Sequence, residues 1–314
     1  MSKAAEYRII IFLSVVATVY ILAFATIIRL LLNRFFSFPL SDQFWKKWLR
    51  QASLIAAFLG MLCFIYGFIE PYWISVSYIK LSTNKFSSNT KPLKIAHFSD
   101  LHSDPTPRLE TSLPELIAKE QPDIIVFTGD TLNSPEGLQV AKEFFSKLSK
   151  IAPTYVVKGN WDSWFWYNLD LFGETGVKEL KSTSEKLSIN GYNFWITGVP
   201  VGQANQIPKL LNQIPKDEFS ILLYHYPDEI EDIAGQLDLY CAGHTHGGQI
   251  AMPFYGALIT YSKFDKKYES GLYKVKDTWL YVNRGIGMEG GNTPRVRFCA
   301  RPELTIIEIY PAKR

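Results

Sequence analysis

The side chains of this sequence that are best suited to chemistry are aspartates, histidines and one asparagine, and they follow short apolar runs. Four of the five histidines belong to this set. Its members are Asp100, His102, Asp130, Asn160, His225, His244 and His246. Carboxylate groups, imidazole rings and amide oxygens are the ligands that hold divalent metal ions in hydrolytic sites. The set therefore predicts a site for two divalent ions.

Each of these residues alone has an ordinary explanation, because an isolated Asp-x-His or Gly-Asp is usually a turn and a lone histidine is usually structural. The same arrangement at the end of several apolar runs makes coincidence a poor explanation. His97 is the exception among the histidines, since it lies inside the first run. We expect His97 to be a packed or hydrogen-bonded structural residue.

The runs that precede the polar residues are typical of β-strands. They cover residues 93–100, 123–130, 154–160, 192–199, 219–225 and 237–244, with further strands expected at 278–285 and 302–310. Segments 113–120 and 137–150 have helical spacing. This alternation predicts an α/β or mixed sandwich of about 220 residues. Loops after the strands would give the polar set a rigid frame that is open to solvent.

The pattern D-x-H, G-D, G-N, H and G-H-x-H resembles that of the calcineurin-like metallophosphoesterases, over roughly residues 92–309. The segments GHTHGGQI (243–250) and VNRGIG (282–287) are similar to a branch that contains membrane-associated bacterial phosphoesterases. The resemblance implies a four-layer α/β (α+β) sandwich, in which two mixed β-sheets are flanked by helices.

The resemblance also implies a role for each polar residue. One metal would be held by Asp100, His102 and His246, and the other by Asn160, His225 and His244, with Asp130 bridging both. Asp130 and Asn160 would be the catalytic members of the set. Mn²⁺ is the expected ion, and Fe or Mg²⁺ are alternatives that the residue types leave open. Two such ions lower the pKa of a bridging water and neutralise charge on the phosphoryl oxygens.

Trp161 departs from that family, most of whose members have at this position a histidine that is a candidate general acid. The indole N–H is too weakly acidic to protonate a leaving oxygen. Either the site has lost catalysis, or its substrate needs no acid. An alcohol leaving group resembles water, with a pKa of about 15.7, whereas a phosphate group has a second pKa of about 6 and leaves as an anion. Because every metal ligand is retained, we favour cleavage of a P–O–P bond.

Aromatic residues crowd the segment that follows, WDSWFWY (161–167). Residues 161, 164, 165, 168 and 172 would share one face of a helix, which fits core packing and substrate contact equally well. Trp166 and Tyr167 fall off that face, so we expect them to be exposed near the site. Trp161, Trp164, Trp166 and Arg284 are the candidate substrate-binding residues.

Two apolar stretches lie near the N-terminus. Residues 9–28 and 51–69 are 20 and 19 uncharged residues, and each is long enough to cross about 30 Å of hydrocarbon. A signal peptide and a buried core helix are the alternatives, but the first stretch exceeds the roughly 7–15 residues of a signal h-region. We expect residues 1–81 to form a membrane hairpin, residues 82–91 a linker and residues 92–314 the metallophosphoesterase domain.

Composition restricts the partners. The net charge of +3 comes with no long basic run, so nucleic acid is not expected. Cys63, Cys241 and Cys299 are odd in number and widely separated, which implies no disulfide framework.

The expected membrane attachment, together with the missing general acid, favours a lipid-linked pyrophosphate as the substrate. Here the sequence resembles the bacterial UDP-2,3-diacylglucosamine pyrophosphatases of lipid A synthesis. A membrane-associated phosphodiesterase with another substrate and a non-hydrolytic metal-binding regulator are the alternatives.

The orientation in the membrane does not follow from charge. Lysine and arginine residues are nearly balanced between the two sides of the hairpin, so the positive-inside rule does not decide it. A nucleotide-activated lipid is made on the cytoplasmic face. That substrate would therefore put the catalytic domain on the cytoplasmic face of the bacterial inner membrane.

Overall fold

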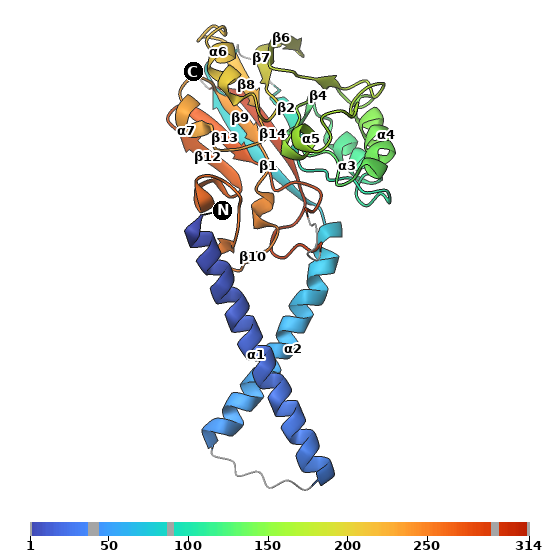
Figure 1. Cartoon of the computed structure of the whole chain (residues 1–314). Coiled ribbons are helices and arrows are strands. Elements are labelled where there is room, and N and C mark those ends of the chain that lie inside the picture. The colour runs from blue at the N-terminus through green and yellow to red at the C-terminus, as the bar shows by residue number, and fades with distance from the viewer. Residues whose placement is uncertain (1, 37–43, 87–90, 290–294, 313–314) are drawn as a thin grey trace. The chain divides into compact units, whose positions relative to one another are not determined.

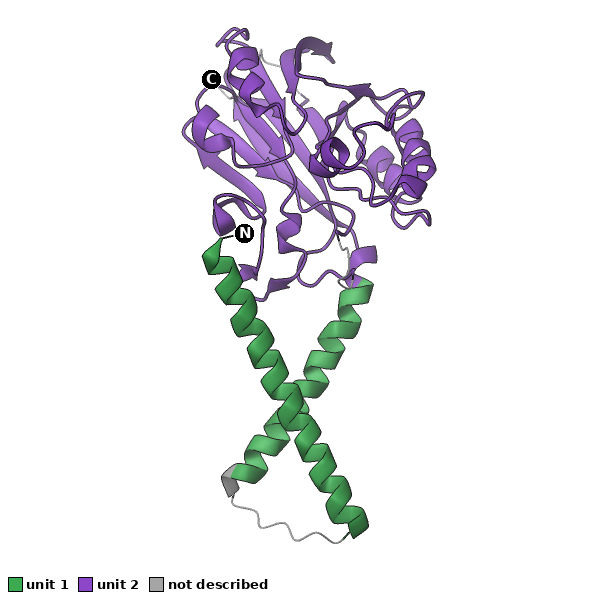
Figure 2. Cartoon of the chain, viewed as in Figure 1, with its two compact units in different colours: residues 1–69 green, residues 70–314 purple. Residues whose placement is uncertain are grey.

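The computed structural model describes residues 2–36, 44–86, 91–289 and 295–312. The chain divides into two compact units, residues 1–69 and residues 70–314 (Figure 2).

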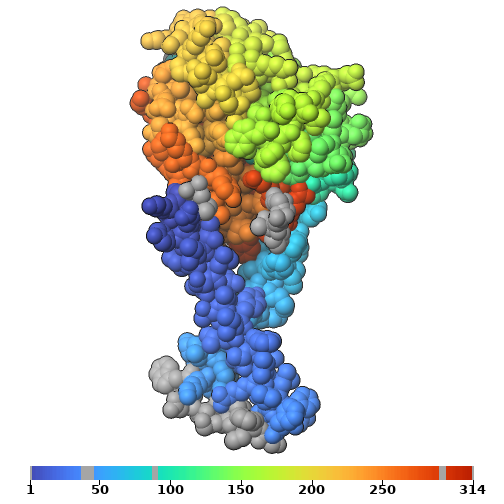
Figure 3. Space-filling model, viewed as in Figure 1, coloured from blue at the N-terminus to red at the C-terminus, as the bar shows by residue number. Residues whose placement is uncertain are grey.

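The first unit consists of two long helices, α1 (Lys3–Phe36) and α2 (Phe44–Ile69), which cross one another (Figure 1). Both are long and apolar enough to span a membrane, and their side chains are largely uncovered (Figure 3). Gly60 allows the close crossing, because a Cβ atom there would lie 2.9 Å from the Tyr20 hydroxyl, which donates to the carbonyl of Ala57. A small residue at a crossing point is typical of helix pairs in lipid.

The second unit is built on two six-stranded mixed sheets (Figure 1). The first sheet contains, in spatial order, β1 (Ser75–Thr83), β14 (Glu303–Pro311), β2 (Leu93–Phe98), β3 (Ile124–Phe127), β4 (Thr154–Val156) and β5 (Lys178–Glu179). The second contains β12 (Gly271–Val275), β13 (Thr278–Val282), β9 (Leu239–Ala242), β8 (Phe219–Leu223), β7 (Tyr192–Gly198) and β6 (Thr183–Ile189). β10 (Ala251–Met252) and β11 (Gly256–Ala257) form a separate two-stranded hairpin.

Three clusters of buried apolar side chains pack the sheets and helices together as four layers. Alternate residues of one strand face opposite ways, so Ile95 packs between the two sheets, whereas Ala96 and Phe98 pack against helices. The helices outside the first sheet are α3 (Leu113–Glu120) and α4 (Leu138–Leu148); those outside the second are α6 (Ile207–Leu211) and α7 (Ile230–Ile233). The expected fold, two mixed sheets flanked by helices, is confirmed.

His97 lies within β2 and is fully buried, with its Nε2 atom 3.1 Å from the hydroxyl of Thr128. Burial lowers the pKa of His97 to about 3, so the ring is neutral. This agrees with the structural role expected for it.

The boundary expected after residue 81 is wrong. Residues 75–83 are strand β1, which pairs in parallel with β14 over its full length at the edge of the first sheet. The second unit begins at Glu70, whose carboxylate is buried and accepts the backbone N–H groups of Cys299 and Ala300. The segment expected to be a linker is therefore in part a strand, and only residues 87–90 of it lie outside the described residues.

A truncation experiment checks this boundary. We expect the chain that starts at Glu70 to fold and bind metal, whereas a chain that starts at Phe86 should be clearly less stable. The longer truncation removes β1 and leaves the backbone groups of β14 unpaired at a sheet edge. Thermal unfolding followed by circular dichroism compares the two, and equal midpoints would contradict a structural role for β1.

Candidate metal centre

The parallel strands of both sheets bring the polar set to one place. β2, β3 and β4 are parallel neighbours in the first sheet, as are β7, β8 and β9 in the second. Loops after their carboxyl ends carry the polar residues: Asp100 and His102 follow β2, Asp130 follows β3, Asn160 follows β4, His225 follows β8, and His244 and His246 follow β9. All seven polar residues therefore lie in loops that follow strands of the two sheets.

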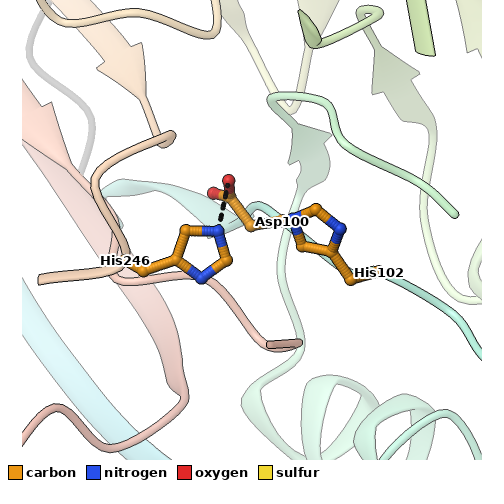
Figure 4. A group of neighbouring side chains, drawn as sticks. All are labelled: Asp100, His102 and His246. Atoms are coloured by element: carbon orange, nitrogen blue, oxygen red, sulfur yellow. Dashed lines mark ion pairs between the residues drawn. The ribbon is translucent and has the colours of Figure 1, made fainter. Parts of the chain in front are cut away.

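Asp100, His102 and His246 form one group (Figure 4). The His246 Nε2 atom lies 3.3 Å from Asp100 Oδ1, and the His102 and His246 rings are 5.1 Å apart between centroids. All three residues are buried. One carboxylate and two imidazole rings at this spacing can hold a divalent cation.

Asp100, Asp130 and His225 form an adjoining group. The His225 Nε2 atom lies 3.2 Å from Asp130 Oδ2 and 3.9 Å from Asp100 Oδ1. The same Asp130 oxygen is 3.7 Å from the Nε2 atom of His102, a member of the first group. Asp100 thus belongs to both groups, and Asp130, a member of the second, also faces His102 of the first, so either carboxylate is placed where it could contact two ions.

His244 and Asn160 adjoin the second group. The ring of His244 is 5.2 Å from that of His225, and its Nε2 atom is 3.4 Å from the carbonyl oxygen of Tyr261, which leaves Nδ1 available. Asn160 is buried at the start of the short helix α5 (Asn160–Trp164). All seven predicted residues therefore belong to the two groups or adjoin them. The metal that each residue would bind stays a prediction.

Unpaired buried atoms show that the site fits metal ions. Within the described part of the chain, Asn160 Oδ1 and both ring nitrogens of His102 have no hydrogen-bond partner. Leaving buried polar atoms unpaired costs about 1–3 kcal/mol each, so a fold retains several of them at one point only if something else satisfies them. His225 Nδ1 donates to the Thr128 carbonyl at 2.7 Å, which turns Nε2 toward the carboxylates.

Backbone conformation also marks the site. Five of the seven residues have φ in the left-handed region, with values of 50° for Asp100, 44° for His102, 62° for Asp130, 72° for His244 and 53° for His246. Each such non-glycine residue costs about 1–3 kcal/mol, and such strain concentrates at functional sites. Close packing adds to it: a Cβ atom on Gly243 would lie 2.4 Å from Asp100 Oδ2.

Sequence reasoning missed two supporting residues. Asp162 is buried, and its carboxylate accepts the backbone N–H groups of Asp130, Thr131 and Gly159 at 2.8–2.9 Å, so it joins the loops after β3 and β4. Its position two residues after Asn160 was a usable signal. The sequence contains no comparable signal for Arg297, because this residue does not follow a strand.

Arg297 is fully buried behind the ligand loops. Its guanidinium donates to the carbonyl oxygens of Gly287 and Ala300 and lies 3.3 Å from His246 Nδ1. Burial lowers the pKa of Arg297 to about 9, and the nearby Asp100 carboxylate opposes that shift. The residue ties the loop that carries His246 to the loop that carries residues 284–287.

The residues predicted to contact the substrate differ in their surroundings and exposure. The Trp161 ring stands edge-on to that of His102 at 5.3 Å, and its indole N–H donates to Glu289 Oε1 at 3.2 Å. Trp164 is 58% exposed. Arg284 forms a 3.2 Å ion pair with Glu303, which is buried.

The expected helical face beyond Trp164 is wrong. Helix α5 ends at Trp164, so residues 168 and 172 do not extend one face with Trp161. Trp166 is also not the exposed residue that was expected, because it packs against the core and its indole N–H donates to the Leu132 carbonyl. Tyr167 is exposed, as expected.

Charge in the cluster predicts how metal binding depends on pH. Burial lowers the pKa of His225, but the Asp130 and Asp100 carboxylates outweigh it and raise the value to about 9. Burial lowers the pKa of His102 to about 3, so that ring is already neutral. Below pH 9 the metal-free site thus holds one proton on His225, which metal must displace.

We therefore expect the affinity for Mn²⁺ to rise by up to about tenfold per pH unit between roughly pH 6 and pH 8, with release of about one proton. Calorimetric titrations in two buffers with different ionisation enthalpies measure that proton. An affinity that is independent of pH would contradict the protonated state of His225.

The chain is similar in sequence to known metallophosphoesterases. The profile of the calcineurin-like phosphoesterase family matches residues 93–248. The chain is 29% identical to the uncharacterised metallophosphoesterase YkuE of Bacillus subtilis, over 77% of this chain and 87% of YkuE. It is 28% identical to the phosphodiesterase YaeI of Escherichia coli (77% and 90% covered), and 24% identical to the UDP-2,3-diacylglucosamine pyrophosphatase LpxG of Chlamydia trachomatis (76% and 90%).

Proposed function

This chain contains a calcineurin-like metallophosphoesterase domain and is a metal-dependent phosphoester hydrolase, and we propose that its substrate is a lipid-linked pyrophosphate. In this proposal one ion is held by Asp100, His102 and His246, and the other by Asn160, His225 and His244. Asp130 holds both. When bound, the ions supply a hydroxide near neutral pH and neutralise charge on the phosphoryl group.

The observation that carries the choice of substrate is the side chain of Trp161. It reaches the metal centre, since its ring lies against His102, but it has no proton suited to a leaving oxygen. Its single N–H already donates to Glu289. The absence of an acid at this position favours a reaction that expels a group stable as an anion. A phosphate monoester, with a second pKa of about 6, meets that requirement, whereas an alkoxide does not.

Exposed aromatic residues near the site support a lipid portion. Trp164, Phe165 and Tyr167 follow Trp161 and are 58%, 55% and 72% exposed. Tyr261, whose carbonyl faces His244, is 60% exposed. Exposed aromatic side chains suit an interface with acyl chains.

The two apolar helices supply the second support. We propose that α1 and α2 span the bacterial inner membrane, with the catalytic domain on the cytoplasmic side, where a nucleotide-activated lipid is made. Distant similarity to LpxG favours UDP-2,3-diacylglucosamine, cleaved to UMP and diacylglucosamine 1-phosphate. Mn²⁺ is the proposed ion.

One incubation tests this function. The purified full chain, loaded with Mn²⁺ in detergent micelles, is given UDP-2,3-diacylglucosamine, and release of UMP is measured. UDP-N-acetylglucosamine, which has the pyrophosphate without the two long acyl chains, is the matched control. We expect turnover of the lipid and little of the control. No UMP from the lipid, in a preparation that hydrolyses a soluble phosphate ester, would refute the substrate but not the enzyme class.

A phosphodiesterase acting on another membrane substrate is the second candidate. It is favoured by the similarity to YaeI, which is named a phosphodiesterase and is slightly more similar than LpxG. Hydrolysis of alkyl phosphodiesters faster than pyrophosphates would decide for it.

A further inference from the structure

One end of the second unit exposes aromatic side chains that the metal centre does not use. Phe254 and Tyr255 form the tip of the β10–β11 hairpin; Phe254 is fully exposed and Tyr255 is 50% exposed. Tyr72, the last residue of the 3-10 helix that follows α2 (Glu70–Tyr72), and Trp73 are 60% and 55% exposed. Large aromatic residues left uncovered in this way often mark an interaction surface.

A short stretch of chain, residues 298–300, connects the two segments that carry these aromatic pairs. On one side the Ala251 N–H donates to the Phe298 carbonyl at 2.8 Å. On the other side the next two backbone N–H groups donate to the buried carboxylate of Glu70 at 2.9 and 2.6 Å. Strand β10 and the first residues of the second unit therefore lie at the same end of that unit (Figures 1 and 2).

A basic group accompanies each pair. The Arg301 guanidinium lies over the Trp73 ring at 4.2 Å. The Lys266 ammonium lies over the Tyr255 ring at 4.4 Å and is paired with Glu269 at 2.7 Å, so Arg301 is the cation of the two that has no carboxylate partner among the described contacts. Aromatic rings with adjacent cations are the combination found where proteins meet the headgroups of a bilayer. Positive groups there are attracted to anionic lipids.

We propose that this surface, which we call the aromatic rim (Tyr72, Trp73, Phe254 and Tyr255, with Arg301 and Lys266), inserts into the headgroup region of an anionic bilayer. The inference rests on the proposed membrane span of α2. If α2 ends at Ile69 at the edge of the hydrocarbon, Glu70 must lie among the headgroups. Residues bonded to Glu70 within the folded unit are then held at the same depth.

The rim is also continuous with the metal centre. Gln249, at the base of the hairpin, exchanges two hydrogen bonds with the main chain of Glu289, at 2.7 and 2.9 Å. Glu289 in turn accepts the indole N–H of Trp161. A rim seated on the bilayer would thus hold the mouth of the site near the plane in which the phosphate groups of a lipid substrate lie.

Fluorescence quenching tests the rim without needing any activity. Full chains carrying Cys63→Ser and Cys299→Ser are labelled with bimane at Phe254→Cys and reconstituted in vesicles of phosphatidylcholine and phosphatidylglycerol. Lipids brominated on the acyl-chain carbons nearest the headgroup are the quenchers. The control label is placed at Asn212→Cys, an exposed position directly after α6, whereas β10 lies at the other end of the unit (Figure 1).

We expect strong quenching at position 254 and almost none at position 212. Equal, weak quenching at both positions would overturn the proposal. Disulfide cross-links between copies at position 254, without quenching, would also overturn it, because they identify the rim as an interface between chains. Quenching in a protein that cannot cleave the proposed lipid would support the rim and refute only the substrate.

A kinetic comparison provides the second measurement. In vesicles, Phe254→Ser with Tyr255→Ser should raise the apparent KM for the lipid substrate by roughly tenfold, the effect of losing buried aromatic area. Hydrolysis of a soluble phosphate ester should be unchanged, because neither residue touches the metal centre. The matched variant Phe254→Leu keeps an apolar side chain and should behave as wild type. Equal loss on both substrates would contradict the rim.

Discussion

Asp130→Ala is expected to abolish hydrolysis and to reduce the amount of bound metal. The Asp130 carboxylate faces a histidine of each group, with Oδ2 3.2 Å from His225 Nε2 and 3.7 Å from His102 Nε2. Its other oxygen accepts the backbone N–H of Trp161 at 2.8 Å. Residues that only orient a ligand typically contribute 10–100-fold, so losing a shared ligand should lower kcat by at least roughly 10³-fold.

Metal content by mass spectrometry and turnover of a soluble phosphate ester measure the two effects. Asp130→Asn separates charge from packing, because its amide oxygen can still accept the Trp161 N–H; it should fold as wild type and be nearly as inactive as the alanine variant. Asp170→Ala, an exposed carboxylate outside the site, is the control that should change neither property. Wild-type turnover in Asp130→Ala would refute the two-metal interpretation.

The grouping of the ligands that follow strands of the first sheet depends on one geometric rule, whereas the joining of His225, His244 and His246 from the second sheet was implied only by the family resemblance. Parallel strands present their carboxyl ends at one edge of a sheet, so residues that follow β2, β3 and β4 must meet there. The rule needs only the strand pattern and the residue after it. It could not find Arg297, which reaches the same place from a loop and is recognised only by its buried contacts with the carbonyl groups behind His246.

Strand β1 was missed for a different reason. Its residues directly follow an apolar helix, and its partner β14 lies more than 200 residues away, with Ser75 opposite Glu303. Neither a turn nor a neighbouring strand signals such a pairing. Helix α5 shows the opposite error: a helical spacing of aromatic residues continues past Trp164, but the chain turns there and buries Trp166 against Leu132. Periodicity describes a face only while the helix lasts.

Trp161→His should raise the hydrolysis of phosphodiesters that have poor leaving groups. The side chain at position 161 already reaches the centre, since its ring is 5.3 Å from that of His102, and Glu289 is available to orient a new imidazole. A positioned imidazole contributes about 10²–10⁴-fold to proton transfer. Cleavage of a pyrophosphate should stay similar or fall slightly, because its leaving phosphate needs no proton.

The measured quantity should be the ratio of the two rates within each variant. The Trp161 ring also packs against Phe165 at 5.2 Å, so a smaller side chain leaves a cavity and lowers the fraction of folded enzyme. That loss affects both substrates equally and cancels in the ratio. Trp161→Phe is the matched control, because it keeps an aromatic ring but can donate no proton; its ratio should equal that of the wild type. If histidine changes neither the ratio nor the absolute phosphodiesterase rate, the leaving group does not explain Trp161. The indole would then be retained for packing or for stacking on the substrate, and the proposed pyrophosphate would lose its main support.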